Sequence, residues 1–365
     1  MLLSTTAAIL LASLFFFSFF LPFMVKGGRC HLGPISEELE KFGSIEVVIP
    51  AYLEATTIGP TVARLQRQLS TWHGASSVTV VASDAETALA AGGADKVIFS
   101  EPCGKPSAVN QGVNQSNADF ICLTDGNTTL QPDSWPQIAA RDLRTAALIS
   151  ANKKESGGRE GLFWNYERKV KRHSSRTSGT LSVIGEFLVF RRSDFREVPS
   201  DIQSDDLWIA MSFDHRGLGS RVNDEITAYE SAANPKDQWE RRVRIAAGQL
   251  YEALPRTPSL LRSAAGRAYL AHKMYRLTVG VAAFWGAAIA TVMIFPPVFG
   301  PLVASAILFG VLHYRGLILL PRPVGFVGVV IGMQVIPVLG GLRAMARYQR
   351  EKKGLRSTGW SKVAR

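Results

Sequence analysis

Two stretches of this chain are apolar enough to lie in a membrane. Residues 2–25 contain no charged side chain. A helix of that length spans about 36 Å, more than the roughly 30 Å of a bilayer's hydrocarbon core. A second apolar block covers residues 277–342 and is broken by Pro296-Pro297 and by polar residues at 313–315. We expect a transmembrane anchor over 2–25 and transmembrane or interfacial helices over 277–342.

A cleaved signal peptide is the alternative for residues 2–25. No Lys or Arg precedes this apolar run, and the bulky residues from Phe15 to Phe23 do not suit a cleavage site. Lys26 and Arg29 follow the run directly, and basic residues tend to stay on the cytosolic side of a membrane. We therefore favour a permanent anchor, with the domain that follows it in the cytosol.

The second apolar block divides into three candidate segments, 277–295, 298–320 and 324–342. With the anchor they make four crossings, which would carry the basic tail, 343–365, away from the cytosolic side that its charge favours. Either one segment does not cross the membrane or the tail is exported against its charge. Gly300-Pro301 interrupts the second segment, so that segment is the candidate for one that does not cross.

The middle of the chain, 44–255, alternates between short apolar runs and amphipathic stretches. Apolar runs at 45–49, 78–82, 96–99 and 119–123 predict buried strands. The stretch from residue 57 to residue 72 places its apolar side chains on one helical face, and 105–115 also reads as a helix. Strands that alternate with helices predict an α/β fold with a doubly wound, Rossmann-like and mostly parallel sheet.

Composition and charge argue against a nucleic-acid-binding protein and against a disulfide-stabilised one. The chain is 47% hydrophobic and 19% charged, yet its formal net charge is +11. The excess charge lies mainly in the tail, which we expect beside anionic lipid, and in residues 153–176. The second stretch is either a solvated loop or helix face, or a surface for anionic headgroups or a phosphorylated lipid acceptor. No nucleic-acid recognition module accompanies either stretch. Three cysteines in 365 residues exclude a disulfide framework.

Acidic residues follow three of the predicted strands. Glu54 comes after the first strand, Asp84 after the second and Asp125 after the fourth. Ligands of parallel α/β sheets bind at the carboxyl ends of the strands. Each acidic residue could simply cap the helix that follows it, but three at successive strand ends predict a binding site for a metal ion or for sugar hydroxyls.

Five short motifs resemble those of family 2 glycosyltransferases, which have the GT-A fold. Residues 49–55 read IPAYLEA, 104–112 read GKPSAVNQG, 118–127 read ADFICLTDGN, 204–207 read SDDL and 241–248 read RRVRIAAG. They occur in the family's order over about 45–250, between membrane segments as in membrane-bound members. The resemblance implies an inverting glycosyltransferase that moves a sugar from a nucleotide-diphospho-sugar, with UDP favoured, to a lipid or glycan acceptor.

The resemblance also implies roles for residues of the donor site. Ala51, Tyr52, Glu54 and Asp84 would hold the base and ribose, and Lys105 would approach the phosphates. Asp125, together with Asn127, would bind the Mg²⁺ or Mn²⁺ ion that bridges the diphosphate, because both metals prefer oxygen ligands.

The acceptor side is implied in the same way. Asp206, with Asp205 beside it, would be the general base that takes the proton of the acceptor hydroxyl. Arg241 and Arg244 would lie near the diphosphate and the acceptor. For the Asp205-Asp206 pair, capping of the helix that begins there is the alternative.

Four positions depart from the family pattern. Leu53 stands where Asn is common, Asn127 where a second Asp is usual, and Arg241 and Ile245 where Gln and Trp are usual. The absence of that Trp favours transfer of one or a few sugars over polymer synthesis. A non-catalytic membrane scaffold that keeps the nucleotide-sugar fold is the alternative function.

Overall fold

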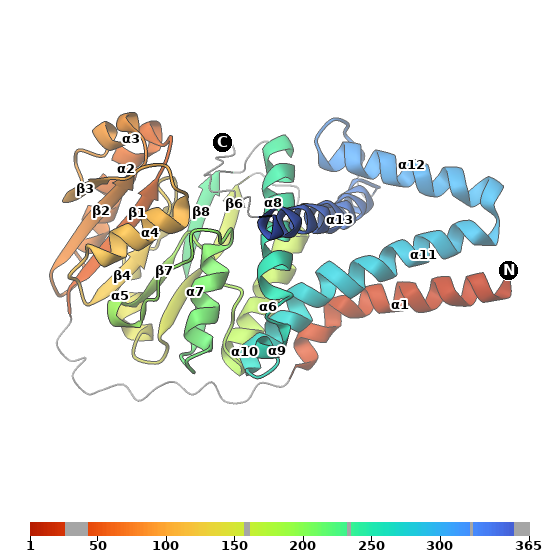
Figure 1. Cartoon of the computed structure of the whole chain (residues 1–365), viewed down its shortest axis with the longest axis horizontal. Coiled ribbons are helices and arrows are strands. Elements are labelled where there is room, and N and C mark those ends of the chain that lie inside the picture. The colour runs from red at the N-terminus through yellow and green to blue at the C-terminus, as the bar shows by residue number, and fades with distance from the viewer. Residues whose placement is uncertain (26–42, 157–160, 232–234, 322–323, 354–365) are drawn as a thin grey trace.

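The computed structural model describes residues 1–25, 43–156, 161–231, 235–321 and 324–353 (Figure 1). The predicted flanking charges at Lys26 and Arg29 and the end of the basic tail lie outside these ranges. An α/β domain occupies one side of the molecule, and long helices from both ends of the chain project from it on the other.

One sheet of eight strands forms the core of the domain, in the order β3-β2-β1-β4-β7-β6-β8-β5. Parallel pairing joins β1 to β2 and β4, β2 to β3, and β6 to β8, whereas β7 is antiparallel to both of its neighbours. The strands are β1 (Ile45–Ala51), β2 (Ser76–Ala82), β3 (Lys96–Phe99), β4 (Phe120–Leu123), β5 (Thr129–Gln131), β6 (Leu148–Ser156), β7 (Leu188–Arg191) and β8 (Ser220–Ser231).

Helices cover both faces of this sheet, and β1 shows how. Val47 and Ile49 point to the face covered by α2, where they pack with Ile58 and Leu65. Val48, between them, faces α4 instead. The domain's helices are α2 (Ala55–Leu69), α3 (Ala85–Ala90), α4 (Lys105–Asn114), α5 (Trp135–Asp142), α6 (Gly161–Thr177), α7 (Asp205–Asp214), α8 (Pro235–Ala253) and α9 (Thr257–Leu260). The doubly wound, mostly parallel sheet predicted from the sequence is therefore confirmed.

Four helices are long and apolar enough to cross a bilayer. They are α1 (Leu2–Met24), the continuous helix Ala264–Ile294, α12 (Pro296–Tyr314) and α13 (Val324–Lys352). The second comprises α10 (Ala264–Tyr269), the π-helical segments η3 (Leu270–Met274) and η4 (Arg276–Gly280), and α11 (Val281–Ile294). It begins well before the predicted start at residue 277, because Ala265 and Tyr269 pack in the core of the domain.

The first span packs antiparallel to α11. Ser18 lies against Gly280, Phe15 against Phe284 and Leu11 against Gly286. The two helices therefore run in opposite directions. Glycine at 280 and 286 lets the helices approach closely, as is usual between membrane helices.

Helix α13 packs on two partners in turn. Its first half lies against the end of α12, where a Cβ on Gly332 would meet Tyr314 at 2.6 Å. Its second half lies against α8, where Gly340 contacts Ala246 and Arg343 pairs with Glu240. The second half of α13 therefore lies beside the α/β domain, along α8 (Figure 1).

Candidate active site

The ends of β1 and β4 meet at the carboxyl edge of the sheet. These strands are neighbours, so the loops that follow them lie side by side. The carboxylate of Glu54, after β1, lies so close to the backbone of Gly126, after β4, that a Cβ at this glycine would clash with it. Two of the sequence-predicted site segments, 51–54 and 125–127, are thus brought together.

The turn after β1 has an unusual backbone. Leu53 has φ of 55°, a left-handed conformation that Asn adopts readily and Leu does not. Asp84, after β2, holds this turn: its Oδ2 accepts a 2.6 Å hydrogen bond from the Leu53 amide, and its Oδ1 accepts one of 2.8 Å from Thr87 as it caps α3. The common Asn of the family motif therefore matches a backbone requirement that Leu53 meets at a cost.

Lys105 lies between Asp125 and Asp205 and contacts both. It is the first residue of α4, and its Nζ lies 2.8 Å from Asp125 Oδ1 and 3.4 Å from Asp205 Oδ2. These carboxylates raise the pKa of the Lys105 ammonium despite its burial. A Cβ at Gly185 would lie 3.3 Å from Lys105 Nζ and 3.6 Å from Asp206 Cβ, so a larger residue there would narrow the space between the two.

Asp206 occupies the first turn of α7 with a perturbed acidity. Burial, and after it the neighbouring charge of Asp205, raise the pKa of Asp206 to about 6. Its Oδ1 accepts a 2.8 Å hydrogen bond from the Leu207 amide. A carboxyl group with this pKa is well suited to accept a proton near neutral pH.

Glu252 of α8 fixes the start of α7. Its Oε1 accepts hydrogen bonds from the amides of Gln203 at 2.7 Å and Ser204 at 3.1 Å, directly before Asp205. The side chain is fully buried. The burial raises the pKa of Glu252 to about 7. The position of Asp206 therefore depends on a residue of the helix that also carries Arg241.

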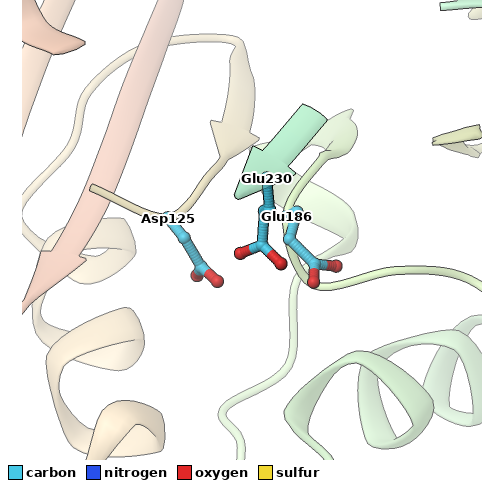
Figure 2. Close-up of side chains that lie close together, drawn as sticks. All are labelled: Asp125, Glu186 and Glu230. Carbon is cyan, nitrogen blue, oxygen red and sulfur yellow. The ribbon is translucent and has the colours of Figure 1, made fainter. Parts of the chain in front are cut away.

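A buried ion network lies next to Asp125 (Figure 2). Lys153 of β6 pairs with Glu186 and, at 2.5 Å, with Glu230 of β8. Arg241 lies 3.2 Å from the same oxygen of Glu186 and 3.5 Å from Glu230. Burial opposes the charge of Glu186, but Lys153 and Arg241 outweigh it and hold the pKa of Glu186 below its usual range.

Three carboxylates could bind a divalent cation here. Oxygens of Asp125, Glu186 and Glu230 all lie within 4.8 Å of one another. Asn127 Oδ1 is buried and has no hydrogen-bond partner among the described residues. This is a set of oxygen donors, as Mg²⁺ and Mn²⁺ require. Since Lys105 pairs with Asp125, and Lys153 with both glutamates, an ion would compete with these ammonium groups.

Two further predicted residues, Ala51 and Tyr52, lie at the end of β1. Ala51 ends β1 and is fully buried, and Tyr52 follows it half-buried. Arg244 is one turn after Arg241 on α8.

The sequence reasoning missed Lys153, Glu186 and Glu230 as members of the site. The available signal for Glu186 was a single carboxylate inside the apolar run 181–190. A charge that interrupts a buried segment must find a partner there.

Comparison with known proteins shows which family and which fold this chain resembles. Residues 46–198 match the pattern of glycosyl transferase family 2. The mannosyltransferase PcManGT from Pyrobaculum calidifontis, solved with GDP-Man and Mn²⁺, is 16% identical with a TM-score of 0.69, and the match covers 94% of this chain and 99% of that one. No curated protein matches the chain.

Two further structures are more distant. Mannosyl-3-phosphoglycerate synthase from Rubrobacter xylanophilus is 16% identical with a TM-score of 0.41, over 61% of this chain and 80% of that one. TarS of S. aureus, residues 1–349, is 12% identical with a TM-score of 0.42, over 85% and 92%. At these TM-scores neither adds to the argument.

The match over 46–198 contains the first three motifs and the β1 and β4 edge. The similarity to PcManGT extends over the whole fold, including its apolar helices. Residues 46–198 therefore carry the pattern of glycosyl transferase family 2, within a GT-A fold that has apolar helices at both ends.

Proposed function

We propose that this enzyme transfers one sugar, with inversion, from a nucleotide-diphospho-sugar to a lipid or glycan acceptor at the cytosolic surface of a membrane. One observation carries the proposal: Lys105 contacts both Asp125 and Asp205, so the predicted donor and acceptor residues converge beside the apolar helices. The sequence favours UDP in the donor, whereas PcManGT was solved with GDP-Man.

In this proposal the donor binds at the ends of β1, β2 and β4. Ala51, Tyr52, Glu54 and Asp84 hold the base and ribose, and Lys105 turns from Asp125 toward the phosphates. Asp125 and Asn127 hold a divalent metal, with Glu186 and Glu230 close enough to contribute. Such a metal stabilises the charge that develops on the leaving diphosphate.

Asp206 acts as the general base. It takes the proton of the acceptor as the acceptor oxygen bonds to the anomeric carbon, while the bond from that carbon to the diphosphate breaks. Asp205 keeps Lys105 near the reacting groups. Arg241, with Arg244 one turn later, supplies positive charge on the far side of Glu186.

The proposed membrane arrangement follows from the contacts of α13. If α1, α11 and α12 cross the bilayer, α12 ends back at the domain, where Tyr314 packs on Trp239. Helix α13 then runs along the membrane surface beside α8. In this arrangement α13, rather than 298–320, does not cross, and the basic tail lies on the cytosolic side with the catalytic domain.

A panel of UDP- and GDP-sugars tests the proposed function. Full-length protein in membranes, supplied with lipid extract, should release nucleoside diphosphate from one donor and form a product of matching mass. Turnover should disappear with EDTA and return with Mn²⁺ or Mg²⁺. Donor binding without any release of diphosphate would instead support the non-catalytic scaffold.

A further inference from the structure

A cluster of buried cations lies where the catalytic domain meets the membrane helices. Glu167 of α6 accepts hydrogen bonds from Lys273 at 2.5 Å and from Arg276 at 2.7 Å, and lies 3.2 Å from His272 Nε2. The Glu167 side chain is 2% exposed, and those of Lys273 and Arg276 are 15% and 13% exposed. The single negative charge of Glu167 is thus paired with two positive charges in a largely buried site.

Lys171, one turn after Glu167 on α6, adds a third cation. It is 8% exposed, and its ammonium makes no hydrogen bond or ion pair to any side chain that the structure describes. The carboxylates that act on its charge include Glu167, Glu186 and Asp206. Burial outweighs them and lowers the pKa of Lys171. A buried ammonium is costly without an anion beside it, so this position calls for an anionic ligand.

The cluster lies at the membrane end of the site. Phe19 and Phe23 of α1 pack against Tyr166, the neighbour of Glu167. Lys273 and Arg276 belong to η3 and η4, π-helical turns of a kind that often mark functional positions. Tyr269, just before η3, has a buried hydroxyl without a hydrogen-bond partner in the described part of the chain. It also lies within electrostatic range of both Asp206 and Glu167.

We propose that Lys171, with Lys273, Arg276 and the Tyr269 hydroxyl, binds the phosphate of a lipid monophosphate acceptor, which enters between α1 and α6. The inference rests on the proposed glycosyl transfer and specifies its acceptor. Cationic side chains and a hydroxyl are typical partners of phosphate oxygens. The lipid chain would follow the aromatic side chains of α1 into the bilayer.

In the proposed reaction, a phosphate oxygen of the acceptor is the nucleophile. A phosphate oxygen forms the bond to the anomeric carbon, and the bond from that carbon to the donor's diphosphate breaks. The nucleoside diphosphate leaves with the electron pair. If the phosphate enters as the monoanion, Asp206 takes its proton, and the product is a lipid phosphodiester of the sugar.

Binding of matched lipids tests the site without turnover. We expect full-length protein in detergent to bind farnesyl phosphate at least tenfold more tightly than farnesol. Lys171→Gln should remove this preference. Lys169→Gln, the same charge change at an exposed position of α6, should retain it. Equal affinity for the two lipids, or an unchanged preference in Lys171→Gln, would overturn the proposal. Competition by inorganic phosphate as strong as by the lipid would show a site for free phosphate and overturn the lipid assignment.

Turnover separates this inference from the proposed function. With the active donor, Lys171→Gln should raise KM for farnesyl phosphate at least tenfold and leave KM for the donor unchanged. A rise in KM for the donor alone would place Lys171 in the donor site and contradict the inference. If no donor is turned over, the proposed function fails, while the binding measurement still decides whether the phosphate site exists.

Discussion

Asp206 is a carboxyl group whose charge the surrounding protein disfavours. Burial and Asp205 both oppose its ionisation, whereas Lys105 favours it. A general base must be ionised to accept a proton, but it gains basicity as its pKa rises toward the working pH. The placement of Asp206 between Gly185, Lys105 and Asp205 is consistent with this compromise.

The acidity of Asp206 predicts the pH dependence of turnover. Its pKa of about 6 means that the ionised base is lost as pH falls through 6. We expect kcat to decrease about tenfold per pH unit below that value. Steady-state rates between pH 4.5 and 8 provide the measurement. Asp214→Asn, at the other end of α7, removes a second carboxyl with a raised pKa and should leave the profile unchanged. A profile flat to pH 5 would contradict the assignment.

The left-handed backbone of Leu53 predicts that a substitution there stabilises the protein. Leu53→Asn should raise the free energy of unfolding by about 1 kcal/mol, because Asn tolerates the left-handed backbone that Leu adopts at 55°. Leu53→Ala is the matched control, since Ala loses the exposed side chain but keeps the backbone cost. Thermal unfolding in detergent measures both. Equal stability of the Asn and Ala variants would show that the left-handed backbone at position 53 carries no energetic cost.

At the scale of elements, α7 depends on α8 through Glu252. Glu252→Ala leaves two backbone amides without their acceptor. We expect a loss of about 1–3 kcal/mol in stability and a lower kcat, because Asp206 is no longer held. Glu240→Ala on the same helix removes a surface pair with Arg343, which should cost less than about 1 kcal/mol. Equal effects of the two substitutions on kcat would rule out a positioning role for Glu252.

The elements were more predictable than their contacts. The runs at 45–49, 78–82, 96–99 and 119–123 lie in β1 to β4, because each pattern of buried residues is local. The convergence of Glu54, Asp84 and Asp125 was also predictable, because neighbouring parallel strands end at the same edge of the sheet. The pairing of Lys153 with Glu186 and Glu230 could not be predicted, because it depends on the order β7-β6-β8. The early start of the helix Ala264–Ile294 could not be predicted, because the charges of Lys273 and Arg276 interrupt the apolar pattern and their partner Glu167 lies on α6.

In the molecule as a whole, the α/β domain and the long apolar helices pack against each other. Helix α13 contacts α8, and Arg347 near its end lies 4.0 Å from Asp201, in the segment that leads to Asp205. The segment that leads to Asp205 therefore contacts α13.

This arrangement predicts the sidedness of the chain. Single cysteines introduced at Ser4 and at Ser357, in a variant without native cysteines, should react with a membrane-impermeant maleimide from opposite sides of sealed vesicles. The prediction follows from three crossings, with α13 on the surface. Cysteine at exposed Ser193, in the catalytic domain, is the control and should react from the same side as Ser357. Labelling of both ends from one side would require an even number of crossings.

In the proposed reaction, this enzyme transfers sugar with Asp206 as its base. The most direct measurement is turnover of the active donor by Asp206→Asn in proteoliposomes, with nucleoside diphosphate and lipid product both quantified. We predict that kcat falls by a factor of about 10²–10⁴, with donor KM nearly unchanged and the unfolding temperature unchanged or higher, since a disfavoured charge is removed. Full turnover by a folded Asp206→Asn variant would contradict the account.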